Sequence, residues 1–177
     1  GLPEVRQHTV RVVKDILSRY DLDAIHMDDY FYPYRIAGKE FPDQKTFEKF
    51  GSGLSKDSWR RSNCDSIILD IRSTIKNTNP RVKFGISPFG VWRNKSQDPM
   101  GSDTKAGQTN YDDLYADPMA WMEGNYIDYL LTFNLEPNRL QITNNNPFLY
   151  EKILIRPITF DSLINDKKNA QNSSLCG

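Results

Sequence analysis

Helix patterns and short apolar strand patterns alternate along this 177-residue chain, and that order constrains its fold more than any other feature. An amphipathic helix precedes each of three apolar segments, and long loops containing Gly and Pro follow the first two. Strands that alternate with helices pair in parallel, with the helices on the faces of the sheet. The sequence therefore predicts an α/β fold with parallel strands near residues 22–28, 82–87 and 126–133.

Three segments carry the helix signals. In residues 3–20 and 59–75 the apolar side chains recur with the period of an amphipathic helix. Ser55 or Asp57 can cap the second helix, because both side chains accept hydrogen bonds from free backbone amides. An Asp-Pro pair opens the third helix, which we expect to span residues 118–124.

Either a doubly wound sheet or a section of a barrel satisfies this order of elements. No Gly-x-Gly-x-x-Gly or Gly-x-x-x-x-Gly-Lys-Ser/Thr motif follows any strand, so nothing supports a nucleotide-binding open sheet. We therefore expect residues 1–133 to be a portion of a (β/α)8 TIM barrel. Residues 134–177 are rich in Asn and lack a clean period, which is typical of a loop or a disordered tail.

Charge and cysteine content limit the partners. Lys plus Arg and Asp plus Glu each number 23, so no net charge favours nucleic acid or an anionic membrane. Cys64 and Cys176 make neither a disulfide framework nor a zinc signature. No apolar run is long enough for a transmembrane segment, and any export signal is expected upstream of this chain. The sequence predicts no metal and no cofactor.

The first predicted strand ends in two adjacent acids, Asp28 and Asp29. Side chains alternate across a strand, so Asp28 shares one face with His26, while Ile25 and Met27 share the face that suits the helices. Barrel enzymes place catalytic groups at the carboxyl ends of their strands. The sequence therefore predicts that Asp28 points into the barrel mouth, with Asp29 in the first turn of the loop.

An acid at this place, followed by aromatic rings, suits glycoside hydrolysis. One carboxylate meets the anomeric carbon or a water molecule, while another carboxyl group protonates the leaving oxygen. Tyr30 and Tyr32 are expected either to bind the apolar faces of sugars or to pack the loop, with His26 as a further substrate-binding residue. Two other interpretations stay open: Asp28 as a turn former or helix cap, and the paired acids as ligands of Mg²⁺ or Ca²⁺.

A second cluster follows the second predicted strand. Ser87, Trp92, Arg93 and Asn94 are expected near the same end of the sheet, where they can stack on sugars and bind hydroxyl groups. Arg93 can also hold a carboxylate. The alternative is a Pro-Gly turn anchored by two buried rings. Ser87 is not expected to be a nucleophile, because the second Gly of a nucleophile elbow is missing after it.

Residues 23–33, 84–94 and 111–117 closely resemble the glycosyl hydrolase-like 10 family, and the resemblance runs from about residue 3 to residue 131. It implies a (β/α)8 barrel in secreted or envelope proteins of bacteria, and at least one branch cuts peptide-free peptidoglycan strands. On this likeness the three strands are the fourth, fifth and sixth of the barrel. A glycan is then the expected partner, and no oligomeric state is indicated.

The run Asp23-x-Ile-x-Met-Asp28 also resembles the fourth-strand motif of retaining glycosidase barrels, in which the final Asp is the nucleophile. This likeness favours Asp28 over Asp29, in agreement with the alternation of side chains. Family members continue after the sixth strand with a Pro-Gln-x-Tyr-Trp stretch, whereas this chain departs from the pattern after Leu131. Our hypothesis is that a reading-frame change or a truncation replaced the remainder.

The sequence thus favours a glycoside hydrolase that acts on a bacterial envelope glycan. The alternative is a non-catalytic carbohydrate-binding or inactive fragment of such an enzyme. A metal-dependent phosphoesterase that uses Asp28 and Asp29 is disfavoured, because the chain has two histidines, His26 and the helical His8.

Overall fold

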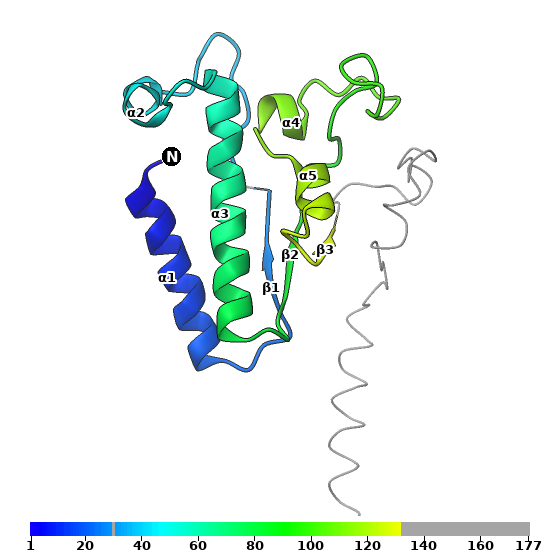
Figure 1. Ribbon diagram of the computed structural model, residues 1–177. Helices are drawn as coiled ribbons and strands as arrows, with labels where there is room; N and C mark the ends of the chain where they lie inside the picture. Colours follow the sequence, from blue (N-terminus) through cyan, green and yellow to red (C-terminus); the bar gives the residue numbers. More distant parts are fainter. Residues whose placement is uncertain (30, 132–177) are drawn as a thin grey trace, which may run out of the picture.

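In the part of the chain that the structure describes, three parallel strands form a sheet, and a long helix covers one of its faces (Figure 1). The computed structural model describes residues 1–29 and 31–131. Its elements are, in chain order, α1 (Pro3–Arg19), β1 (Ala24–Met27), α2 (Gln44–Phe50), α3 (Lys56–Thr78), β2 (Lys83–Ile86), α4 (Asn110–Asp113), α5 (Pro118–Glu123) and β3 (Tyr129–Leu130).

The sheet has the order β1-β2-β3, and both pairs are parallel. In this register His26 lies beside Gly85, and Gly85 lies beside Tyr129. The predicted α/β character with parallel pairing is therefore confirmed. That these strands belong to a (β/α)8 barrel stays a prediction.

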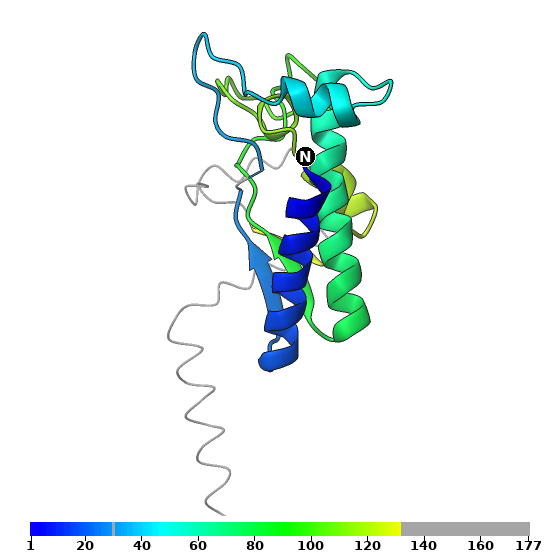
Figure 2. The same cartoon turned by 90° about the vertical axis from the view of Figure 1, so that its left-hand side faces the viewer.

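Helix α3 supplies the centre of the hydrophobic core. Its apolar stripe ends in Ile68, Ile71 and Ile75, which are at most 1% exposed and pack with Phe84 and Ile86 of β2. Figure 2 shows α3 on one side of the strands, and α1 packs beside α3. The predicted stripe of the second helix is confirmed, and Ser55 caps the helix by accepting from the backbone amide of Ser58.

Helix α1 buries less of its predicted stripe. Val13 and Leu17 lie in the core, but Val5, Val12 and Tyr20 are 44–62% exposed. Only part of the apolar face therefore has a neighbour among the described residues. None of the helices in the described part of the chain is long and apolar enough to cross a membrane.

The strands are shorter than the sequence predicts, the third one most of all. Its regular part begins at Tyr129 rather than residue 126, because the backbone amide of Tyr126 donates to Trp121 at the end of α5. The carboxylate of Asp128 then accepts from the backbone amide of Phe84 at 2.8 Å. The predicted residues 132 and 133 and the tail 134–177 lie outside the described residues.

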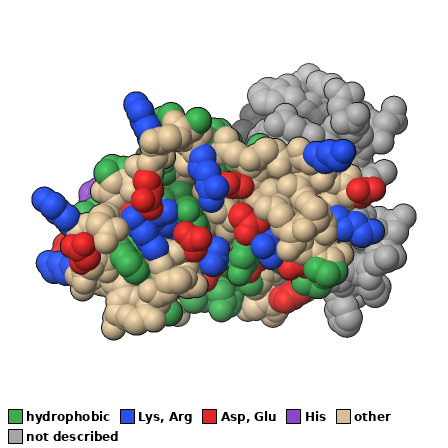
Figure 3. Space-filling model, turned by 90° about the horizontal axis from the view of Figure 1, so that it is seen from above, with side chains coloured by type: hydrophobic (Ala, Val, Ile, Leu, Met, Phe, Trp, Pro, Cys, Tyr) green, Lys and Arg blue, Asp and Glu red, His purple; other side chains and the backbone are tan. Residues whose placement is uncertain are grey.

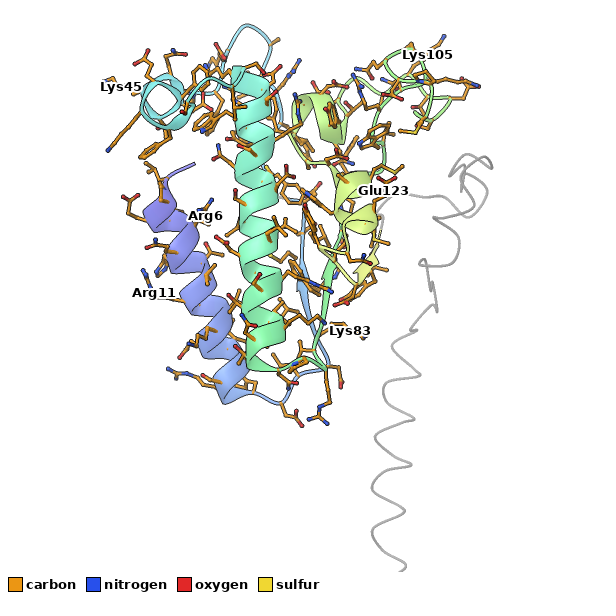
Figure 4. The ribbon with its side chains drawn as sticks, viewed as in Figure 1. Arg6, Arg11, Lys45, Lys83, Lys105 and Glu123 are labelled. Carbon is orange, nitrogen blue, oxygen red and sulfur yellow. The ribbon has the colours of Figure 1, made fainter. Side chains whose placement is uncertain are left out.

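Both long loops contain a short helix that the sequence analysis did not predict, α2 in the first and α4 in the second. The loops lie at the carboxyl ends of the strands (Figure 1). Figure 4 shows Lys83, at the start of β2, and Lys105, in the second loop, at opposite ends of the molecule. This arrangement gathers the loops over the strand ends where the sequence predicts the site.

Candidate active site

Asp28 follows directly after the last residue of β1. Ile25 and Met27 pack against the hydrophobic core, so the alternation of the strand puts His26 and Asp28 on the opposite face. The Asp28 side chain is exposed, and its Oδ1 accepts from the backbone amide of Asp29 at 2.9 Å. The predicted alternation is confirmed within β1 for Ile25, His26 and Met27, while the orientation of Asp28 into a barrel mouth and its catalytic role stay predictions.

Asp29 makes a different set of contacts. Its Oδ2 accepts from the Tyr34 hydroxyl at 2.9 Å, and the Tyr34 ring meets Phe89 edge-on at 6.3 Å. Asp29 therefore links the start of the first loop to a ring in the same loop and, through that ring, to the second loop. These contacts give Asp29 a role in positioning the loop, whereas the carboxylate of Asp28 is more open.

His26 is held by hydrogen bonds on both ring nitrogens. Nε2 lies 2.5 Å from Ser87 Oγ, and Nδ1 lies 3.2 Å from the Tyr129 hydroxyl. The His26 and Tyr129 rings are nearly parallel, 14° apart, with centroids separated by 5.6 Å. Burial lowers the pKa of the imidazole, and the nearby Asp28 opposes part of that shift. The site thus places a neutral, oriented imidazole next to an exposed carboxylate.

Tyr32 uses its ring to hold the first loop against the protein. It meets Tyr115 and Phe41 edge-on, at 5.1 Å and 5.4 Å between centroids. Its hydroxyl accepts from Asn63 of α3, and burial raises its pKa to about 12. Tyr30 lies outside the described residues.

Arg93 binds two carboxylates in the second loop. It makes a two-point contact with Asp112, at 2.9 Å and 3.0 Å, and a third bond to Asp98 at 3.0 Å. Its guanidinium also lies 4.8 Å from the centre of the Tyr111 ring. Trp92 donates from Nε1 to Asp117 at 3.0 Å. Arg93 therefore does hold carboxylates, as predicted, and these are carboxylates of the protein itself.

Asn94 organises the second loop from within, and it is 8% exposed. Its Oδ1 accepts from the Ala106 backbone amide at 2.8 Å and from Thr104 Oγ1 at 2.8 Å. Its Nδ2 donates to the Ala106 carbonyl at 3.0 Å and to Gln97 at 2.9 Å. These bonds give Asn94 a role in loop structure, and its predicted contact with substrate stays a prediction.

The two long loops meet over the strand ends, and we name their segments 31–43 and 88–109, which precede α2 and α4, the rim loops. Arg35 of the first rim loop pairs with Asp113 at 2.9 Å and donates to the Asp112 carbonyl. Its backbone amide donates to Gln108 at 2.9 Å. Seen from this end, acidic and basic side chains lie next to one another over the surface (Figure 3). The rim loops are thus fixed relative to one another by polar contacts.

The chain matches the glycosyl hydrolase-like 10 family over residues 1–136. It belongs to this family. It is 54% identical to the protein named glycosyl hydrolase YngK of Bacillus subtilis strain 168 over 132 residues, which cover 73% of this chain and 26% of that protein. It is 44% identical to glycosyl hydrolase DigH of Escherichia coli K12 over 131 residues, which cover 73% of this chain and 29% of that protein.

The resemblance to the glycosyl hydrolase-like 10 family that the motifs indicated is thereby confirmed. The chain spans between a quarter and a third of the length of the curated relatives it matches. Two of the three motifs, residues 23–33 and 84–94, hold β1 and β2 with the starts of the rim loops. The place of the strands as fourth, fifth and sixth units of a barrel stays a proposal.

The structure brings some of the predicted site residues together. His26, Asp28 and Ser87 lie at one strand end, whereas Asn94 lies inside its own loop. Tyr129 is the site residue that the sequence analysis missed. A signal for it existed, because a Gly inside a strand, here Gly85, often marks a close approach by a neighbouring group.

In the described part of this glycosyl hydrolase-like 10 chain, no group of three or more His, Cys, Asp or Glu side chains is arranged to hold a metal ion. Asp28 and Asp29 are therefore without a third ligand of these types among the residues that the structure describes. The chemistry to be explained at this site is that of a carboxylate, an imidazole and two hydroxyl groups.

Proposed function

We propose that this chain is part of the catalytic domain of a glycoside hydrolase, with Asp28 as its first-choice carboxylate. Support comes from the family and from two relatives that carry the name glycosyl hydrolase. The observation that carries the proposal is the position of Asp28, exposed just past β1 on the face of the sheet away from the core. The proposed substrate is a bacterial envelope glycan, with peptide-free peptidoglycan strands favoured.

Asp28 would act on the anomeric carbon, either directly or through water. Glycosidases pass through an oxocarbenium-like transition state, and a fixed carboxylate stabilises the positive charge that develops there. A neighbouring cation would weaken this effect, and the lowered pKa of His26 keeps that ring neutral near pH 7. The carboxylate can therefore present its full charge to the sugar.

The second carboxyl group of the reaction is none of the four loop acids that already bind a side chain of the protein. Asp98 and Asp112 pair with Arg93, Asp113 pairs with Arg35, and Asp117 accepts from Trp92. We propose that the three parallel strands are the fourth to sixth of a (β/α)8 barrel, whose other units supply the acid. On the same likeness we propose a secreted or envelope location.

The test is hydrolysis of peptide-free glycan strands by a protein that also carries the proposed remaining barrel units, measured by the release of reducing ends or soluble fragments. Asp28→Asn keeps the size of the side chain and removes its charge, so kcat should fall about 100-fold or more. Asp29→Asn is the matched control, because that carboxylate accepts from Tyr34 in the loop and should matter much less. Wild-type activity in Asp28→Asn would show that the assignment is wrong.

A non-catalytic carbohydrate-binding protein is the second candidate. Hydrolysis needs a second, available carboxyl group. Four acids of the second loop and its end already bind other side chains, which favours this candidate: Asp98, Asp112, Asp113 and Asp117. Calorimetric titration with glycan fragments separates the two candidates. Heat of binding without any product after long incubation supports the binding protein, and product formation supports the hydrolase.

A further inference from the structure

Tyr129 reaches across the middle strand to His26. The two residues flank Gly85 in the register of the sheet, one on β1 and the other on β3. A Cβ atom built on Gly85 would lie 2.1 Å from Cε2 and Cζ of the Tyr129 ring. The ring therefore occupies the space that any larger residue at position 85 would need, and it lies against the backbone of β2.

This placement brings the Tyr129 hydroxyl to the imidazole of His26. The hydroxyl lies 3.2 Å from Nδ1, while Ser87 Oγ lies 2.5 Å from Nε2 on the other side of the ring. Ser87 is 1% exposed, so its hydroxyl is held within the protein. Rotation of the imidazole would break both contacts at once. Residues of two neighbouring strands thus fix the orientation of one ring.

The chemistry of the two hydroxyl groups selects one arrangement of protons. A neutral imidazole has one nitrogen that donates and one that accepts. A phenol is the stronger donor of the two hydroxyl types, and partial burial raises the pKa of Tyr129, so its hydroxyl keeps the proton that it donates. In the arrangement that this difference favours, the Tyr129 hydroxyl would donate to Nδ1, and the Nε2–H group would donate to Ser87 Oγ.

We propose that Tyr129 is a positioning residue of the site, which fixes His26 as the Nε2–H tautomer beside Asp28. This inference rests on the proposed hydrolase function for its catalytic consequence, but the contact itself can be tested without substrate. An imidazole locked in this way has both nitrogens engaged within the protein, so it keeps a fixed position beside Asp28. It also remains uncharged, so it does not form an ion pair with Asp28.

Nuclear magnetic resonance of ¹⁵N-labelled imidazoles tests the contact. The chain has two histidines, and His8→Gln assigns the signals of His26. We expect the Nε2–H tautomer for His26 at neutral pH and a mixture of tautomers in Tyr129→Phe, which keeps the ring. Ser87→Ala removes the partner of Nε2 and should shift the balance towards the Nδ1–H form.

The matched control is Tyr126→Phe, three residues earlier, whose ring packs against the hydrophobic core and should leave the His26 signals unchanged. Unchanged His26 signals in Tyr129→Phe, or an Nδ1–H tautomer in the parent protein, would overturn the proposal. Backbone amide spectra establish that each variant is folded before its imidazole signals are compared.

Activity on glycan strands provides the second measurement. Loss of one neutral hydrogen bond that positions the imidazole should lower kcat of Tyr129→Phe roughly threefold to tenfold, with KM little changed. The two proposals fail separately. A normal rate in Asp28→Asn, together with an altered tautomer in Tyr129→Phe, removes the hydrolase assignment and supports the positioning contact. A reduced rate in Asp28→Asn, together with unchanged His26 signals in Tyr129→Phe, supports the hydrolase assignment and excludes the positioning role of Tyr129.

Discussion

Arg60 of α3 binds Asp43 of the first rim loop through two hydrogen bonds, Nε to Oδ2 at 2.8 Å and Nη2 to Oδ1 at 2.7 Å. The two side chains are 4% and 7% exposed. Arg60 also donates to the Tyr115 hydroxyl at 2.8 Å. One buried guanidinium therefore joins the first rim loop, helix α3 and the segment that follows α4.

Asp43→Asn should destabilise the protein strongly, because it leaves the buried Arg60 charge with the exposed Glu40 in place of a buried carboxylate partner. Breaking one side of a buried ion pair costs about 3–5 kcal/mol. Urea unfolding, followed by Trp fluorescence, measures the change. Glu40→Gln is the control, because Glu40 contacts the same arginine from an exposed position and its loss should change stability little. Equal midpoints for Asp43→Asn and the parent protein would contradict the prediction.

Gly85→Ala should destabilise the sheet by displacing the Tyr129 ring. The added Cβ would lie 2.1 Å from two ring atoms, and such overpacking costs about 1–3 kcal/mol. The size of the effect should depend on the ring. In a Tyr129→Ala background the same substitution should therefore cost less, which a double-mutant cycle measures by chemical unfolding. Equal costs in the two backgrounds would show that the ring is not the obstacle.

Asn94→Ala should open the second rim loop without unfolding the sheet. The substitution removes both hydrogen bonds to the Ala106 backbone and leaves the half-buried Ala106 amide without this partner, at a cost of about 1–3 kcal/mol for the two bonds. Trypsin should then cut faster after Lys95 and Lys105, which flank this contact. Asn77→Ala, at the exposed end of α3, is the control and should be cut at the parent rate.

Local signals in the sequence predict the local parts of the fold. Asp117 caps α5 by accepting from the Ala120 amide, as the Asp-Pro pair indicates, and α3 buries its apolar stripe. Helices α2 and α4 were missed because they are short and, unlike α5, have no side-chain hydrogen bond at the N-cap. Helix α2 follows Asp43, whose carboxylate binds Arg60, and such tertiary contacts leave no periodic pattern.

The candidate site also has a part that local sequence signals predict and a part that depends on tertiary contacts. The face of Asp28 could be predicted, since it depends on the alternation of side chains within one strand. The contact of His26 with Tyr129 could not, because residues 103 positions apart meet there through the register of two strand pairs. No pattern within a single segment carries that information.

Asp128 should make stability depend on pH in the acid range. Partial burial alone would raise the pKa of this carboxyl group, but hydrogen bonds from the Phe84 amide, Lys76 and Arg72 hold the pKa below its usual value. A group whose pKa is lower in the folded state stabilises the protein above its unfolded pKa of about 3.9 and loses that contribution as pH falls through the folded pKa.

Asp128→Asn should therefore cost about 1.5–3 kcal/mol at neutral pH, and the difference from the parent protein should shrink below about pH 4. Thermal unfolding from pH 7 to pH 2 measures both curves, with exposed Glu123→Gln as the control (Figure 4). A difference that stays constant down to pH 2 would mean that the charge of Asp128 does not stabilise the junction between β2 and β3.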